Sequence, residues 1–234
     1  SSDSIIWSNQ YTSSLFSEYR IIALDLPGHG NSARLKSYAA TEISRALIET
    51  IQLFDNVILV GHSLGGHFLI EALPYLDNCK GLFIVGVAPV KKPVNLNEAF
   101  LPDERLALLF QKELSISETV EFAELVSEPN GLLDYDIKKR IAGTDPNFRT
   151  GIAESITKDE LSDEVEILMK STVPLAILHG ENDPLVNGDY LRTLAMNGLW
   201  QDRIHVIKGS GHSPQLERPK EFNKLLYEFL KHLR

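Results

Sequence analysis

The stretch "NVILVGHSLGGHFLIEALPYL", residues 56–76, places one serine among glycines between an apolar run and a segment of helical character. Its centre, "GHSLG" at 61–65, fits the G-x-S-x-G spacing of a sharp turn that leads from a strand into a helix. Such a turn strains the backbone at the serine, and its glycines let strand and helix approach closely. The stretch therefore predicts that the Ser63 hydroxyl is held out at a strand end, where it can act as a nucleophile.

Short apolar runs rich in Ile, Val and Leu alternate with longer segments of helical period along the rest of the chain. Because these runs are continuously apolar, they are typical of strands buried on both faces of a parallel sheet. The helical segments, such as 37–54 and the one that begins near Pro219, carry an apolar stripe on one face. This alternation predicts an α/β fold, with a mainly parallel sheet flanked by helices. The predicted strands are 20–26, 56–60, 81–87, 173–180 and 203–208.

Residues 95–171 interrupt this alternation, because they hold several helix-like pieces and no convincing strand. A helical insertion between two strands of a parallel sheet is expected to cover the carboxyl ends of the strands, where ligands bind. We therefore predict a core formed by 1–94 and 172–234, with a helical cap at 95–171. The predicted cap helices are 101–114, 116–126, 135–142 and 147–156, with breaks at 129–131 and 145–147.

The bulk composition limits the possible partners. With 23 basic and 32 acidic residues among 234, the formal net charge is −9, which disfavours nucleic acid and anionic membranes. Cys79 has no second cysteine to pair with, and no apolar run approaches the ~18 residues of a membrane span. The spacings of metal ligands and of phosphate-binding glycine loops do not occur. We expect a cytoplasmic protein that acts on a small molecule without a metal or cofactor.

Two further polar clusters follow predicted strands, at the edge where the carboxyl ends of parallel strands meet. After 173–180 come Glu181 and Asp183, and the proline after Asp183 places that residue deeper in the turn than Glu181. After 203–208 comes His212, which lies among small residues. Each alone is an ordinary loop residue. The order serine, acid and histidine, each directly after its own strand, is that of one class of hydrolase triad.

On this reasoning Ser63 is predicted to be the nucleophile, His212 the base that takes its proton, and Asp183 the acid that orients the imidazole. The N–H of Leu64, at the start of the following helix, is expected to stabilise an oxyanion. The other histidines within the predicted elements and turns are interpreted as structural. They are His29 in a tight turn, His62 and His67 beside the serine, and His179 and His205 in strands.

Four motifs fall in order at predicted strand ends: "DLPGHGNS" (25–32), "GHSLGGH" (61–67), "HGENDP" (179–184) and "GSGHSPQLERP" (209–219). In these motifs the chain resembles the α/β-hydrolase superfamily over essentially its whole length. The resemblance implies a capped sheet, a catalytic triad of Ser63, Asp183 and His212, and no cofactor.

The resemblance also shows a difference at the start of the chain. Members of the superfamily begin with strands and a His-Gly loop that supplies a second oxyanion N–H, and nothing here matches them. One of those strands lies between the strands at 20–26 and 56–60, so that its absence would leave two rows of unpaired backbone groups. We therefore expect the N-terminal strands to be missing from this chain and the native protein to extend upstream of Ser1.

Within the superfamily the chain resembles the N-acyl-homoserine lactone hydrolases, in "SSDSI" (1–5), "GLFIVGVAPV" (81–90), "GLLDYDIKKRIAGTD" (131–145), "GLW" (198–200) and "HVIKGSGH" (205–212). The resemblance implies hydrolysis of a lactone. A lid tyrosine of those enzymes falls at Phe122, which is therefore a candidate substrate contact that lacks a hydroxyl. Phe122 is equally well explained as one apolar position of a cap helix. Candidates to line an acyl pocket are Leu106, Leu109, Phe110, Phe122 and Leu125.

Two other interpretations stay open. A general carboxylesterase or a hydrolase of carbon–carbon bonds would use the same three residues, because an apolar cap suits an acyl chain in a lactone and in an open ester alike. A ligand receptor, a different class of protein, would keep the triad and signal by movement of the cap. Repeated turnover of substrate separates enzyme from receptor, and we favour the enzyme because the triad is the residue set that the chemistry needs.

Overall fold

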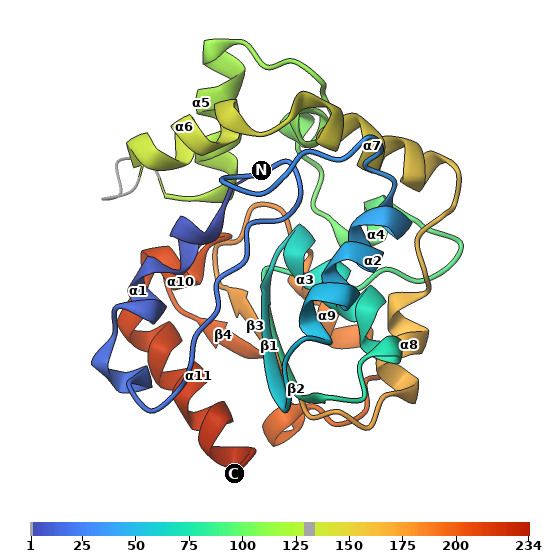
Figure 1. Ribbon diagram of the computed structural model, residues 1–234. Coiled ribbons are helices and arrows are strands. Elements are labelled where there is room, and N and C mark those ends of the chain that lie inside the picture. The colour runs from blue at the N-terminus through green and yellow to red at the C-terminus, as the bar shows by residue number, and fades with distance from the viewer. Residues whose placement is uncertain (1, 129–133) are drawn as a thin grey trace.

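A computed structural model of the chain describes residues 2–128 and 134–234, so that the predicted break at 129–131 lies outside the described residues. Its centre is a parallel four-stranded sheet in the order β1-β2-β3-β4 (Figure 1). The strands are β1 (Val57–His62), β2 (Cys79–Val85), β3 (Leu175–Gly180) and β4 (His205–Ile207). Four of the five predicted strands are therefore confirmed within two residues of their bounds.

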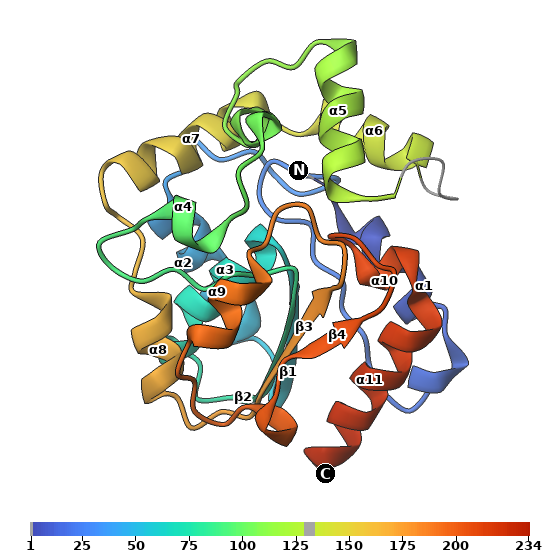
Figure 2. The ribbon, with the colours of Figure 1, turned by 180° about the vertical axis from the view of Figure 1, so that it is seen from behind.

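Helices cover both faces of the sheet, with α2, α3 and α8 on one face and α1 and α11 on the other (Figures 1 and 2). Their apolar stripes are buried as the helical period predicts: Ile43 and Leu47 of α2 are 0% and 7% exposed. The helices are α1 (Ser8–Tyr11), α2 (Ala40–Ile51), α3 (Leu64–Ala72), α4 (Leu96–Ala99), α5 (Ile116–Val126), α6 (Asp134–Gly143), α7 (Pro146–Thr157), α8 (Glu164–Lys170), α9 (Gly188–Thr193), α10 (Pro214–Glu217) and α11 (Pro219–His232).

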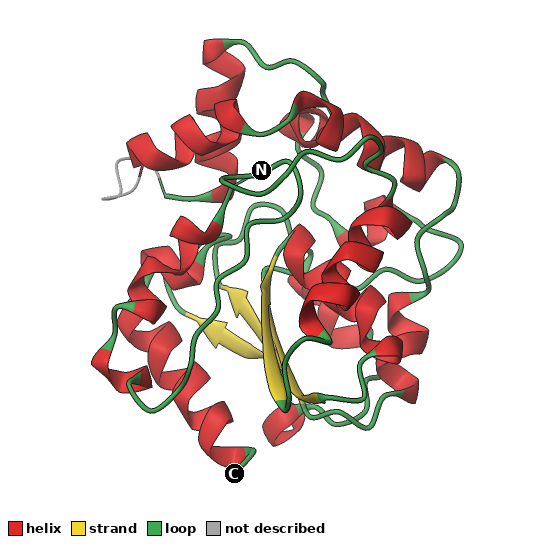
Figure 3. Cartoon of the chain, in the orientation of Figure 1, coloured by secondary structure: helices red, strands yellow, loops and turns green. Residues whose placement is uncertain are grey.

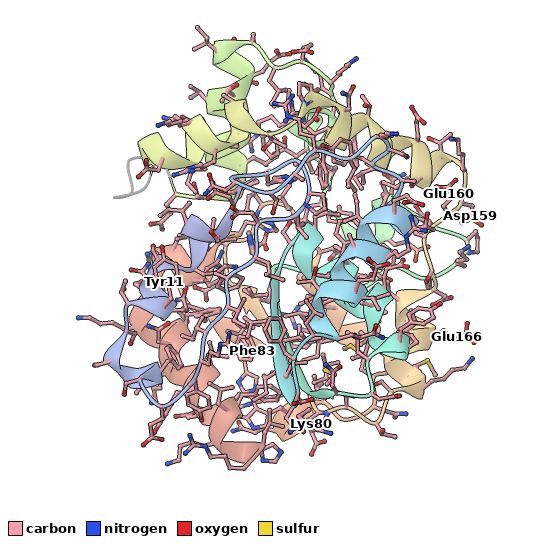
Figure 4. All side chains as sticks on the ribbon, viewed as in Figure 1. Tyr11, Lys80, Phe83, Asp159, Glu160 and Glu166 are labelled. Carbon is pink, nitrogen blue, oxygen red and sulfur yellow. The ribbon has the colours of Figure 1, made fainter. Side chains whose placement is uncertain are left out.

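Strand β2 lies between two neighbours, and all of its residues except Lys80 are buried. Its residues Leu82, Phe83, Ile84 and Val85 are each 0% exposed, which explains why the run is apolar on both faces. Figure 4 shows Phe83 inside the molecule and Lys80, near the start of the strand, at the lower rim. The carboxyl end of β2 is therefore held in the core, and the loop that follows it begins at the carboxyl edge of the sheet.

The prediction of a strand at 20–26 is wrong. The segment is extended but pairs with no strand of the described chain, and Figure 3 shows it as a loop beside the sheet. A cavity of about 900 Å³ is lined by Ile21, Ile22 and Leu24 on one side and by β1 on the other. A strand forms only where a partner backbone lies about 4.8 Å away, and none does here. The gap lies where the sequence predicts a missing strand.

Helices α5, α6 and α7 of the insertion lie over the carboxyl ends of the strands, whereas α8 lies on one face of the sheet (Figures 1 and 2). Helix α5 has the bounds predicted for it, and a capping box starts it, since Ser115 and Glu118 each bond the other's backbone N–H. The predicted 101–114 helix is shorter, a 3₁₀ helix at Glu104–Leu109. Helix α8 packs against α3 of the core. The division at 94 and 171 stays a prediction.

Across residues 2–128 and 134–234, none of the helices has both the length and the apolar character that crossing a bilayer requires.

Candidate active site

Ser63 occupies a strained turn between β1 and α3. Its φ of 49° and ψ of −128° lie in a region that side-chain-bearing residues rarely adopt. Three backbone hydrogen bonds hold it there: its own N–H donates to the Val85 carbonyl at 3.0 Å, and its carbonyl accepts from the N–H groups of Gly66 and His67 at 2.8 and 3.2 Å. The turn thus has the sharp geometry predicted from the sequence.

Two glycines allow α3 to approach the sheet behind this turn. A Cβ on Gly61 would lie 2.7 Å from the Gly66 Cα, and one on Gly66 would lie 2.4 Å from the Val87 Cγ2. Neither distance is possible without displacement of the strand, the helix or the Val87 side chain. Gly65, by contrast, has no atom within 4 Å of an added Cβ. The glycines of the motif therefore have different roles, which a stability measurement can separate.

The Gly66→Ala change is expected to destabilise the fold by about 1–3 kcal/mol, because the added methyl overpacks the contact with Val87. The matched change Gly65→Ala lies on the same helix with open space around it, so better helix propensity should stabilise it by up to about 1 kcal/mol. Urea unfolding of both variants beside the parent measures the two effects. Equal stability of the two variants would contradict the packing argument.

His212 and Asp183 form a buried pair at the same edge of the sheet. The Nδ1–H of His212 donates to Asp183 Oδ2 at 2.9 Å and lies 3.1 Å from Oδ1. The two residues are 1% and 5% exposed. Because Nδ1 faces only a carboxylate, it carries the proton, and the neutral ring has its lone pair on Nε2. That Nε2 is buried and has no hydrogen-bond partner among the described residues, so it is available to accept a proton.

The surroundings of Asp183 keep it ionised. Burial alone would raise the pKa of its carboxyl, but attraction to His212 and hydrogen bonds from His212 and from the N–H groups of Leu185 and Val186 outweigh burial and lower it. Its sequence neighbour Glu181 instead accepts the N–H of Gly209 at 2.9 Å. Of the two candidate acids in this turn, the structure pairs Asp183 with the histidine.

Ser63 and His212 lie on the two sides of the loop after β2, without a hydrogen bond between them. Val85 accepts the Ser63 N–H at 3.0 Å. A Cβ on the next residue, Gly86, would lie 3.0 Å from His212 Cε1, and Gly86 has a φ of 62°. A residue with a side chain here would meet the imidazole and be strained as well. The small loop residue therefore lets the histidine approach the serine turn.

The loop that carries His212 is organised by Glu217, which the sequence reasoning missed. The Glu217 carboxylate accepts the Ser210 hydroxyl at 2.8 Å, the Gly211 N–H, and the Ser213 N–H at 3.2 Å. These donors flank His212 on both sides. The position of an acid five residues after the histidine, on helix α10, was the available signal. It could not show that the side chain folds back onto the loop.

The cavity of about 900 Å³ that begins at the gap beside β1 continues to Ser63 and Leu64 beneath the cap. The Leu64 N–H starts α3 and has no acceptor within the helix. Of the five candidate lining residues, Leu109, Phe110 and Phe122 line this cavity. Leu106 and Leu125 do not, and Leu125 is 1% exposed in the protein interior. Phe122 also belongs to the apolar core of the cap, and its contact with a substrate stays a prediction.

Two other histidines near the site, His29 and His67, make structural contacts. His29 donates from Nδ1 to the Pro27 carbonyl at 3.1 Å, and burial lowers its pKa to about 3. His67 donates to the Glu164 carboxylate at 2.8 Å. Burial would lower the pKa of His67, but the charge of Glu164 outweighs it and the pKa is raised. In the part of the chain that the structure describes, no three His, Cys, Asp or Glu side chains group as a metal would require.

The fold and the site define a capped α/β protein with a serine turn at one strand end and a histidine–carboxylate pair beside it. The sequence profile of the alpha/beta hydrolase family matches residues 1–225. The chain belongs to the alpha/beta hydrolase family, and it is a hydrolase of that family. The resemblance found in the four sequence motifs is thereby confirmed.

Solved structures and curated relatives support a finer comparison. The N-acyl homoserine lactonase AidH complexed with N-butanoyl homoserine superimposes with a TM-score of 0.92 at 28% identity, covering 99% of this chain and 86% of that one. A pimeloyl-(acyl-carrier protein) methyl ester esterase of Vibrio cholerae is 26% identical over 96% of this chain and 88% of its own length. Esterase YbfF of Escherichia coli is 25% identical, with 92% and 84% covered. The chain is thus similar both to a lactonase and to esterases.

Proposed function

We propose that this chain is a serine hydrolase that cleaves small carboxylic esters through an acyl-enzyme, and that its substrates are N-acyl-homoserine lactones. The observation that carries the proposal is the buried His212–Asp183 pair, which lies at the same edge of the sheet as the strained Ser63 turn and whose Nε2 has no hydrogen-bond partner among the described residues. A nucleophile, a base within reach and a group that orients the base are what acyl transfer requires.

In the proposed reaction, Ser63 Oγ forms a bond to the carbonyl carbon while His212 Nε2 takes the hydroxyl proton. The Asp183 carboxylate stabilises the imidazolium, and the Leu64 N–H stabilises the oxyanion. The carbon–oxygen bond to the leaving group then breaks, and the leaving alkoxide takes the proton from Nε2. Water, deprotonated by the same nitrogen, releases the acid and restores Ser63. In a lactone the leaving alcohol stays attached to the acyl group, so that the ring opens to one product.

The preference for lactones is supported by similarity to the lactonase AidH, complexed in its structure with N-butanoyl homoserine. The apolar cavity beside Ser63, lined by Leu109, Phe110 and Phe122, suits a short acyl chain and is compatible with a lactone and an open ester alike. Similarity to two esterases favours the alternative, a general carboxylesterase with the same machinery. The acid and alcohol halves of the substrate therefore need to be varied separately.

A matched substrate panel tests this choice. We expect kcat/KM for N-butanoyl- and N-hexanoyl-homoserine lactone to exceed that for p-nitrophenyl butanoate and hexanoate by at least about tenfold, once rates are corrected for the more reactive phenol leaving group. Ring opening is followed by proton release, and phenol release by absorbance. Faster cleavage of the open esters would contradict the lactone assignment and favour the esterase. Turnover limited to one equivalent would favour a receptor.

A further inference from the structure

His62, interpreted from the sequence as a packing residue, makes a specific contact with the catalytic histidine. It is the last residue of β1 and directly precedes Ser63. Its Nε2 lies 3.0 Å from the backbone carbonyl oxygen of His212, 150 residues away in sequence, and the two rings are 4.9 Å apart at their centroids. One side chain therefore joins the strand that carries the nucleophile to the loop that carries the base.

The partner of this nitrogen fixes the state of the ring. A carbonyl oxygen only accepts, so that Nε2 of His62 carries the proton and donates. Burial, with a further contribution from repulsion by His212, lowers the pKa of His62 to about 3, and the ring stays neutral at any ordinary assay pH. Charge forms on His212 during the proposed reaction, and a neutral neighbour places no second cation beside it.

The Nε2–H of His62 has a second acceptor in the same loop, the Ser213 hydroxyl. Ser213 Oγ lies 3.4 Å from His62 Nε2, and the Ser213 hydroxyl donates its own proton to the Val126 carbonyl at the end of cap helix α5. Ser213 can therefore only accept from His62. The His62 N–H is thus shared between two adjacent oxygens of the His212 loop, which restrains the loop more than a single contact would.

We propose that His62 is a positioning residue: its Nε2–H holds the His212 peptide at a fixed distance from Ser63, so that the imidazole Nε2 can reach the serine hydroxyl. This inference rests on the proposed function, since it assigns His62 a task within that reaction. The Glu217 carboxylate binds the N–H groups on either side of His212, whereas His62 binds the carbonyl of His212 itself. Of these two contacts, the one through His62 joins the His212 loop to β1, the strand that directly precedes Ser63.

The test compares two substitutions of His62. In His62→Phe a ring remains but the donor is lost; in His62→Gln the side-chain amide can place an N–H near the position of Nε2. Because misplacement of a catalytic group by about 1 Å can cost on the order of 100-fold, we expect kcat of the phenylalanine variant to fall about 10- to 100-fold with little change in KM. The glutamine variant should recover most of the lost kcat. The rates are measured on the best substrate of the panel.

The matched control is His205→Phe. His205 is the first residue of β4, is 5% exposed, stacks on Trp200 at a ring-centroid distance of 4.5 Å and has a backbone hydrogen bond with that residue. It should lose stability but keep the parental kcat. Equal kcat in parent and His62→Phe, or equal loss in both His62 variants, would overturn the positioning role. If the parent is active and Ser63→Ala is inactive, such a result would contradict only the positioning role of His62, and the proposed hydrolase function would remain. An inactive parent would contradict both the proposed function and the positioning role.

Discussion

Ser63→Ala is expected to lower kcat by about 10⁴- to 10⁶-fold on any substrate that the parent hydrolyses, the range that loss of a triad nucleophile produces. The hydroxyl is the group whose bond to the acyl carbon starts the proposed reaction, and among the described residues no other serine has a positive φ. Alanine keeps the Cβ, so the unusual backbone of the turn, with φ of 49° and ψ of −128°, need not change. KM and thermal stability should therefore stay near those of the parent.

A serine that is buried elsewhere gives the matched control. Ser44 on α2 is 8% exposed and its hydroxyl has no hydrogen-bond partner in the part of the chain that the structure describes, so Ser44→Ala should keep the parental rate. Labelling with a fluorophosphonate, which reacts with activated serines, adds an independent readout. Mass spectrometry should find one adduct on the parent and on Ser44→Ala, and none on Ser63→Ala. Parental turnover by Ser63→Ala, or labelling of that variant, would rule out Ser63 as the nucleophile.

The elements that could be predicted from sequence are those whose signals are local. Helix α5 begins and ends where the sequence predicts it, and the local Ser115–Glu118 capping box stabilises its start. The apolar run of β2 is buried on both faces. The run at 20–26 carries the same apolar signal, yet it is not a strand, because a strand also depends on a partner that is distant in sequence. Composition reveals an extended apolar segment; it does not reveal what lies beside it.

The candidate site likewise has parts that could be predicted from the sequence and parts that could not. Three chemistry-bearing loops could be predicted because the carboxyl ends of parallel strands meet at one edge, and the pairing of His212 with Asp183 follows from that geometry. The contacts of Glu217 and His62 with the His212 loop could not be predicted. They depend on how side chains fold back across the site, and the His62 contact joins residues 150 apart. Residue type and spacing do not indicate which side chains make such contacts.

Asp183 is the residue whose replacement tests the orientation of the base. In Asp183→Asn the amide can present its N–H₂ to His212 Nδ1, which moves the ring proton to Nε2. The nitrogen that must accept the serine proton is then already protonated, and kcat is expected to fall about 10⁴-fold at neutral pH. KM should change little, because the carboxylate is buried behind the imidazole and 5% exposed.

Glu181→Gln is the control for this substitution, since Glu181 is the other acid of the same turn and binds the Gly209 N–H rather than the histidine. It should retain the parental kcat. The pKa of Asp183 is held below its ordinary value of 3.8, so the carboxylate is ionised at every pH above that value, and any loss of parental activity between about pH 7 and 5 does not arise from its protonation. Full activity in Asp183→Asn together with loss in Glu181→Gln would assign the acid to Glu181. A small loss in both would mean that the imidazole is oriented by its loop alone, through Glu217 and His62.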